Sequence, residues 1–276
     1  MIINQELLIG LKPIYNTITF EIKKQRKKFF AFLVLIIMVA IAIAVISGFM
    51  KPDTKSEFFL TSLFFIIYLE DFAACLFFSA IICSEFDKKT GYIVFPKINK
   101  YKLILGKYLG NLILVITLIT SYYIIIGVLG FFYYGGETSI RLFYSYLIAL
   151  LYLSALSSFV TFFSSFLKSV NGTIVITFIL LLLGFLMIDQ IIALIFAEKF
   201  EPLYSLAFLG NLIANILAVP FPNPRYIKVP FDFENPSGPS IVQWLTPDPM
   251  VGITMMLLFT VVYFTLAALL FKRRQL

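Results

Sequence analysis

Long apolar runs alternate with short polar and charged segments along the whole chain. Six of the runs are at least as long as the roughly 20 helical residues that cross a hydrocarbon core of about 30 Å. In lipid, a spanning segment must satisfy its own backbone hydrogen bonds, which favours helices. The pattern therefore predicts an all-α polytopic membrane protein with a single transmembrane domain, residues 1–276. The six predicted transmembrane helices cover residues 29–50, 58–83, 109–134, 142–167, 172–197 and 250–271.

The composition supports this class. Hydrophobic residues make up 61% of the 276 residues and charged residues only 13%, whereas soluble domains are about one half apolar and about one quarter charged. The first apolar run begins near Phe29 and already has the length of a span, so it lacks the short apolar core of a cleaved signal peptide. We expect no cleaved targeting segment and a location in the cell membrane.

The Lys and Arg residues are distributed unevenly among the connecting segments. An even number of spans places both termini on one side, and sixteen of the 22 Lys and Arg residues fall on that side. Because cytoplasmic segments are enriched in Lys and Arg, both termini are predicted to be cytoplasmic. Topology and contact with anionic lipid headgroups then explain the net charge of +7, and nucleic-acid binding is not expected.

Residues 1–28 combine two patterns. Apolar residues recur at helical spacing from Ile3 to Leu11, and a basic run, Lys23–Lys28, follows after Pro13. This predicts an amphipathic helix that lies in the membrane interface, is kinked near Pro13 and is anchored by its cations. The basic run also has a simpler explanation, as the positive flank that orients the first span, and the two explanations are compatible.

The loop before the last span, residues 198–249, is the longest predicted extracytoplasmic segment. It begins with an apolar stretch, Leu203–Val219, that is interrupted by Asn211 and Asn215 and is typical of an interfacial or re-entrant helix. Eight of the twelve prolines follow and favour extended and turn structure. We expect a small Pro-rich cap over the spans, either a passive lid or a surface that contacts substrate.

The sequence contains no constellation typical of an enzyme. There is no histidine, which removes the usual general base and the commonest metal ligand. Cys75 and Cys83 lie eight residues apart in one predicted helix, too far to form a disulfide. A phosphate-binding G-x-x-x-x-G-K-[ST] motif is also absent, since Tyr101 precedes and Tyr108 follows the Gly106-Lys107 pair. We therefore expect no catalytic activity, no metal site and no cofactor bound by this chain.

Three acidic residues lie within predicted spans. Glu70 and Asp71 are near the middle of the second span, where each ionised acid costs about 2.5–3.5 kcal/mol. They are candidates for the lining of a conduit or for a protonatable switch, or they form a hydrogen bond between helices or mark a helix that dips into an outer vestibule. Asp189 lies nearer the outer end of the fifth span, from which its side chain is expected to extend toward the surface.

The basic segment Ser84–Lys107 separates the second and third spans. It contains six lysines, Gly91 and Pro96, with short apolar and aromatic stretches between them. This combination of Gly, Pro and short apolar stretches predicts a short structured loop on the cytoplasmic side rather than a flexible linker. Such a loop either docks a small helix in a groove of a partner protein or serves only to orient the spans.

Two short motifs resemble the type 2 ABC exporter permeases (ABC-2 type). In that family an acidic residue ends the second span, a Gly-containing turn and a proline follow, and a Gly-Lys or similar pair opens the third span. The corresponding residues here are Glu85, Thr90-Gly91, Pro96 and Gly106-Lys107. The segment from Phe20 to Arg26, which includes Glu21, is similar to the interfacial elbow helix of the family, and the order of six spans agrees as well.

The resemblance implies a permease subunit of an exporter that moves a substrate out of the cell. It implies a dimer with an identical or homologous second permease, and two separate ATPase subunits that bind ATP and Mg²⁺. Residues 84–107 would then be the cytoplasmic coupling loop. A further interpretation is an immunity or signalling complex of the same architecture. The alternative from another functional class is a nucleotide-independent proton-linked carrier, or an intramembrane enzyme, that uses Glu70 and Asp71. The implied coupling residues are Glu21, Arg26, Glu85, Gly91, Pro96 and Lys107; the candidate pathway residues are Glu70, Asp71 and Asp189.

Overall fold

A computed structural model gives the structure of the chain, which is 83% helical. Within the residues that the structure describes, six helices are long and apolar enough to cross a membrane, which supports the prediction of a multi-pass membrane protein. The structure describes residues 2–50, 52, 54–87, 99–135, 140–196, 200–230 and 240–273. The spanning helices are α1 (Ile2–Met50), α2 (Lys55–Phe78) with its extension α3 (Cys83–Asp87), α5 (Lys100–Tyr134), α6 (Ile140–Phe166), α7 (Val170–Ile179) continued by the π-helical turn η1 (Leu180–Gly184) and α8 (Phe185–Phe196), and α10 (Pro249–Arg273).

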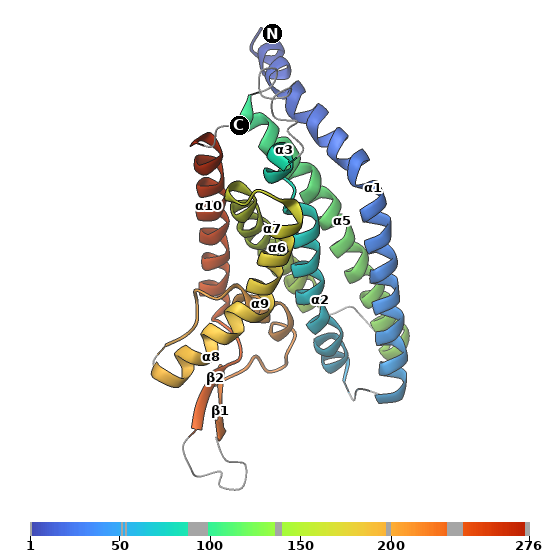
Figure 1. Cartoon of the computed structure of the whole chain (residues 1–276). Coiled ribbons are helices and arrows are strands. Elements are labelled where there is room, and N and C mark those ends of the chain that lie inside the picture. Colours follow the sequence, from blue (N-terminus) through green and yellow to red (C-terminus); the bar gives the residue numbers. More distant parts are fainter. Residues whose placement is uncertain are drawn as a thin grey trace.

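Helices α2 and α6 form the centre of the bundle, since 67% of the residues in the most apolar 18-residue stretch of each span are buried. Helix α6 packs against α10 and α2, while α1 packs along α5 (Figure 1). The fifth and sixth spans lie at the periphery, where few of their side chains are buried and many apolar ones remain exposed within this chain. Lipid or another protein chain therefore covers these faces.

Side-chain caps fix where several helices begin. The hydroxyl of Thr54 accepts a hydrogen bond from the backbone of Glu57 at the start of α2, and Asn99 caps α5 in the same way through Tyr101. Ser169 caps α7 through the amide of Gly172. These caps satisfy amide groups that have no partner within the helix, so the polar residues between the apolar runs set the element boundaries.

The N-terminal segment is continuous with the first span. Helix α1 continues through Pro13 to Met50, so a separate interfacial elbow at residues 1–28 is not confirmed. Its polar side chains Thr17, Glu21 and Gln25 are four residues apart and are buried on one face. That face packs against α5, because the α5 glycines Gly106 and Gly110 allow the two backbones to approach closely.

The region between α8 and α10 contains a short helix and a hairpin. Helix α9 (Leu206–Asn215) is ten residues long and largely buried against α2 and α6, so the apolar stretch predicted at 203–219 does not form a full span. Strand β1 (Tyr226–Pro230) pairs with the antiparallel strand β2 (Ser240–Trp244), with Tyr226 opposite Trp244. The hairpin accounts for part of the Pro-rich segment; its role as an outer cap stays a prediction.

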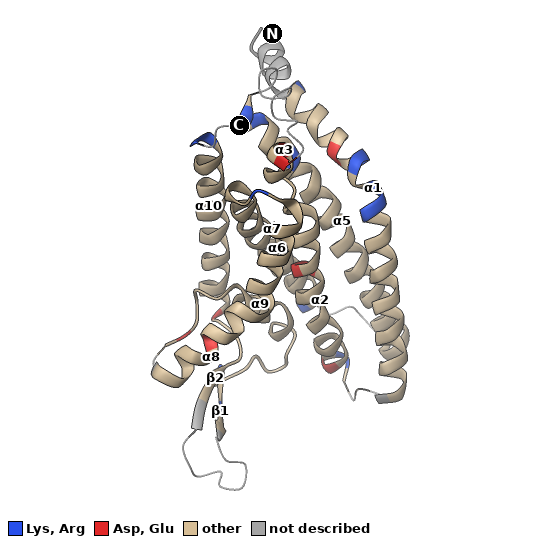
Figure 2. Cartoon of the chain, in the orientation of Figure 1, with Lys and Arg blue, Asp and Glu red and all other residues tan. Residues whose placement is uncertain are grey.

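The two ends of the bundle differ in charge. The first turns of α1 and the last turn of α10 lie at the same end, and the hairpin lies at the opposite end (Figure 1). Most of the described Lys and Arg residues are found toward the end that holds the termini (Figure 2). This distribution matches the asymmetry of the sequence on which the predicted cytoplasmic orientation depends.

Candidate functional site

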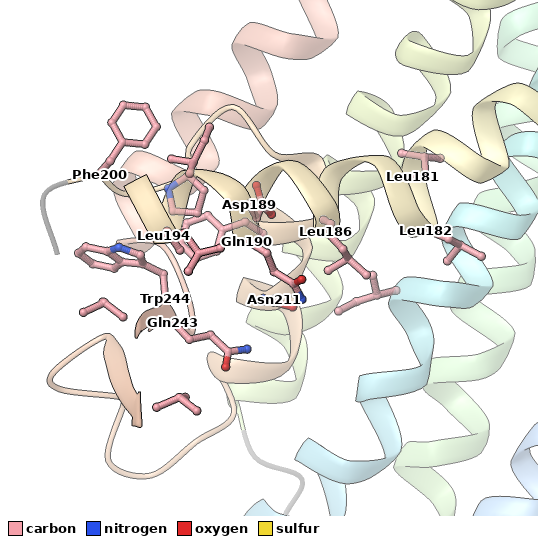
Figure 3. A pocket seen from close by; sticks show the side chains of 18 of the residues that line it. Leu181, Leu182, Leu186, Asp189, Gln190, Leu194, Phe200, Asn211, Gln243 and Trp244 are labelled. Carbon is pink, nitrogen blue, oxygen red and sulfur yellow. The ribbon is translucent and has the colours of Figure 1, made fainter. Parts of the chain in front are cut away.

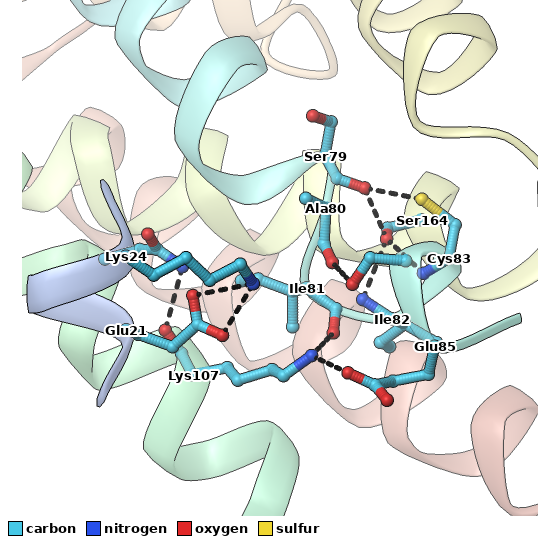
Figure 4. Close-up of polar contacts among 12 residues, drawn as sticks. Glu21, Lys24, Ser79, Ala80, Ile81, Ile82, Cys83, Glu85, Lys107 and Ser164 are labelled. Atoms are coloured by element: carbon cyan, nitrogen blue, oxygen red, sulfur yellow. Dashed lines mark hydrogen bonds and ion pairs between the residues drawn. The ribbon is translucent and has the colours of Figure 1, made fainter. Parts of the chain in front are cut away.

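A charged cluster, buried except for Lys24, lies between α1, α3 and α5, toward the end of the bundle that holds the termini. It comprises Glu21, Lys24, Glu85 and Lys107, and we call it the Lys107 cluster (Figure 4). Lys107 of α5 forms an ion pair with Glu85 of α3, and the two side chains are only 5% and 10% exposed. The ammonium group of Lys107 also donates a hydrogen bond to the carbonyl of Ile81 at 3.3 Å.

The break between α2 and α3 places Glu85 opposite Lys107. Residues 79–82 form turns, and Ser164 of α6 forms hydrogen bonds with three backbone groups at this break (Figure 4). Its hydroxyl oxygen accepts hydrogen bonds from the amides of Ile82 and Cys83, each at 3.1 Å. The same hydroxyl donates to the carbonyl of Ser79 at 2.7 Å.

Glu21 belongs to the same cluster through α1. It is 1% exposed, it pairs with Lys24 at 2.9 Å, and its Cβ lies against Gly110, one helical turn from Lys107. The structure thus gathers Glu21, Glu85 and Lys107, three of the residues implied in coupling. Arg26 does not join them, because its guanidinium lies over the ring of Phe30 on the exposed side of α1.

Two of the residues implied in coupling, Gly91 and Pro96, lie outside the described residues. Helix α3 ends at Asp87 and α5 begins at Lys100, so the ion pair between Glu85 and Lys107 joins the two helices that flank the loop.

Glu70 and Asp71 lie deep in the centre of the bundle, where they are 0% and 3% exposed. Asp71 accepts a hydrogen bond from the hydroxyl of Tyr152 at 3.1 Å. Among the described residues, neither carboxyl oxygen of Glu70 has a hydrogen-bond partner. The two neighbours therefore have different surroundings. Burial of a carboxyl group without a hydrogen-bond partner costs free energy, and an apolar side chain at the same position would avoid that cost.

A cavity of about 490 Å³ lies beside α2, between the η1–α8 segment, α9 and the hairpin (Figure 3). Asp71 and Asp189 both line it, and we call it the acidic pocket. Asp189 is half-buried and accepts a hydrogen bond from the hydroxyl of Ser205 at 2.7 Å. Ser205 also caps α9 by accepting from the amide of Phe208, so one hydroxyl links Asp189 to the start of that helix.

Several residues of these sites carry no recognisable signal in the sequence. Tyr152 and Ser164 lie within an apolar run, and nothing in their spacing assigns them to Asp71 or to the α2–α3 break. Tyr204 lies just before α9, where burial and, to a smaller extent, the adjacent Asp189 carboxyl raise the pKa of its hydroxyl. Among the described residues this hydroxyl has no hydrogen-bond partner. Within the described part of the chain, no three His, Cys, Asp or Glu residues gather as a metal site would need.

The chain matches no family model and no curated protein. Its function is therefore inferred from the placement of its own residues.

Proposed function

We propose that the chain is the membrane subunit of an ABC-2 type exporter, driven by separate ATPase subunits that bind ATP and Mg²⁺. It works with a second permease, identical or homologous, and moves a substrate out of the cell. Both termini, the Lys107 cluster and residues 84–107 face the cytoplasm. The chain itself binds no nucleotide and catalyses no reaction.

The Lys107 cluster is the observation that carries this proposal. Glu21, Glu85 and Lys107 come from three separate segments, and each occupies a position that the ABC-2 resemblance marks for coupling. Glu85 pairs with Lys107, and Glu21 lies against Gly110, one turn further along α5, toward the end of the bundle enriched in Lys and Arg. A loop that served only to orient the spans needs no buried ion pair at its base, because surface charges suffice for topology.

The packing of the helices provides a path for force. A push on residues 88–98 acts on α3 and α5 together, because the Glu85–Lys107 ion pair joins them. Helix α1 follows α5 through the close contact at Gly106 and Gly110. Helix α2 is joined to α3 by the turn at residues 79–82, which Ser164 holds, and it carries Asp71, so the same movement reaches the acidic pocket.

Site-specific photocrosslinking in the native host tests the partner and the orientation together. A photoreactive benzophenone amino acid at Asp87, the exposed last residue of α3, is expected to capture a protein whose peptides contain a Walker A motif, identified by mass spectrometry. The matched control is Ile227, an exposed residue of β1 at the opposite end of the bundle. Capture of the ATPase from Ile227 and not from Asp87 would contradict the proposed orientation.

The surroundings of Glu70 favour one alternative, a nucleotide-independent proton-linked carrier. A buried carboxyl group without a hydrogen-bond partner among the described residues suits reversible proton binding. This alternative predicts that the chain alone dissipates a pH gradient across liposomes and that Glu70→Gln abolishes the effect. Our proposal predicts no such dissipation by the chain alone.

A further inference from the structure

We propose that the acidic pocket binds cationic amphiphiles, molecules that join an apolar chain or ring system to a positively charged group. As a binding site the pocket stands on its own geometry; as the substrate site of an exporter it also rests on the proposed function. The cavity of about 490 Å³ is large enough for a small organic ligand, since ligand pockets commonly enclose about 300–1,000 Å³.

The lining of the pocket is apolar with a few polar groups. Leu182 and Leu186 lie on one side and Phe200 and Trp244 on the other, and Asp189 lies between them (Figure 3). The π-helical turn η1 contributes part of this wall; such turns occur frequently at functional sites. The arrangement suits a ligand whose apolar part contacts both sides while its polar group reaches the carboxyl group of Asp189.

The charge of the pocket selects the sign of the ligand. Asp71 and Asp189 both line it, and among the described residues no Lys or Arg forms an ion pair with either. Arg225 lies over the ring of Trp244, but its guanidinium is already paired with Glu201 at 2.6 Å. A cationic ligand supplies the missing positive charge, whereas an anionic one would meet two carboxyl groups in a medium of low dielectric constant.

Glu70 does not contribute to this site. It adjoins Asp71 in sequence but is not among the residues that line the cavity. The ligand therefore contacts Asp71 and Asp189, from α2 and α8, and its binding joins the core helix α2 to the peripheral fifth span.

Trp244 provides a direct readout, because it is the only tryptophan of the chain and it lines the pocket. The full chain is reconstituted in phosphatidylcholine liposomes without ATP or any partner, and ω-bromoundecyltrimethylammonium is added while tryptophan fluorescence is recorded. Bromine quenches tryptophan on contact, so binding gives saturable quenching. Bromoundecanol, which has the same chain without the charge, is the matched neutral probe. We expect its affinity to be at least about tenfold lower, equal to about 1.4 kcal/mol.

Two variants assign the effect to the acids. Asp189→Asn keeps an oxygen that accepts from Ser205 but removes the charge, and it is expected to weaken binding of the cationic probe about tenfold while leaving the neutral probe unchanged. Glu57→Gln, at the exposed start of α2 and outside the pocket, is expected to change neither affinity.

Equal affinity of the two probes, quenching that rises linearly with probe, or no change in Asp189→Asn would overturn the proposal. If Asp189→Asn does not fold, the comparison of the two probes with the unmodified chain decides. Because no nucleotide or partner is present, failure here leaves the proposed coupling to an ATPase untouched, and failure of that coupling leaves this binding untouched.

Discussion

Removal of Lys107 by the substitution Lys107→Met is expected to open the α3–α5 junction. The variant leaves the carboxyl group of Glu85 at a position where the side chain is only 10% exposed, and it also removes the hydrogen bond to the carbonyl of Ile81. Loss of one partner of a buried ion pair costs about 3–5 kcal/mol. The pair lies toward one end of the bundle, so we use the lower value, about 3 kcal/mol, which corresponds to a change of about 100-fold in an opening equilibrium.

Cys83 reports this opening directly. It begins α3, two residues before Glu85, and its thiol is free and buried. In a Cys75→Ala background, a maleimide reagent reacts with Cys83 only when the junction opens. Under conditions in which reclosing is faster than labelling, the labelling rate is proportional to the open population. Lys107→Met is therefore expected to raise the labelling rate about 100-fold in mild detergent.

Two further variants separate the ion pair from a general effect of charge. Lys272→Met removes an exposed cation from the last turn of α10 and is expected to change the labelling rate by a few fold at most. The double variant Glu85→Gln with Lys107→Met removes both charges and should label within about tenfold of the unmodified protein. A Lys107→Met rate within about threefold of the Lys272→Met rate would refute the view that this ion pair holds the junction.

Three other substitutions test the packing. Ser164→Ala removes the hydroxyl that two amides and one carbonyl at the α2–α3 break contact, for a loss of about 1–3 kcal/mol. The Cys83 labelling rate should rise at least about tenfold, and an unchanged rate would exclude the proposed bridging role. Gly106→Ala places a Cβ 2.7 Å from a side chain of α1 and should lower the thermal midpoint of unfolding, measured by thiol labelling. In the control Gly127→Ala the nearest atom is 3.6 Å away, so the midpoint should stay equal or rise. Tyr122→Phe removes a hydrogen bond of 2.6 Å to a backbone carbonyl of α2 and should lower the free energy of unfolding by about 1 kcal/mol in the same assay. An unchanged free energy of unfolding would show that this bond is dispensable.

The spans were predictable because their signal is local. A run of about 20 apolar residues has few alternatives to a spanning helix, and all six predicted runs coincide with long apolar helices. The short helix in the 203–219 stretch was predictable as well, since Asn211 and Asn215 interrupt a run that would otherwise approach the length of a span.

The packing of α1 against α5 was not predicted, although the sequence carried a signal for it. Thr17, Glu21 and Gln25 recur every four residues, which marks a polar face that can be buried against another helix. Gly106 and Gly110, four residues apart in an apolar run, mark the complementary face of α5. The prediction rested on the apolar and basic residues instead, and its interfacial position for residues 1–28 stays a prediction.

The sites depend on contacts that no local pattern encodes. Ser205 lies sixteen residues after Asp189, and it reaches that carboxyl group only because the chain reverses between α8 and α9. The bond between Tyr152 and Asp71 likewise joins two central helices whose relative rotation the apolar pattern leaves undetermined. Sequence reasoning could therefore name the acids, but the acidic pocket emerges only from the packing of α2, α8, α9 and the hairpin.

The most direct test of the central claim is to express the tagged chain in its native host, purify it in mild detergent and assay the eluate for ATP hydrolysis. Our account predicts a stoichiometric ATP-hydrolysing partner. It also predicts that a variant in which a Gly/Ser linker replaces residues 88–96, with Glu85 and Lys107 retained, inserts normally but loses that partner. A solitary chain without ATPase activity that still carries protons or solute across liposomes would contradict the account.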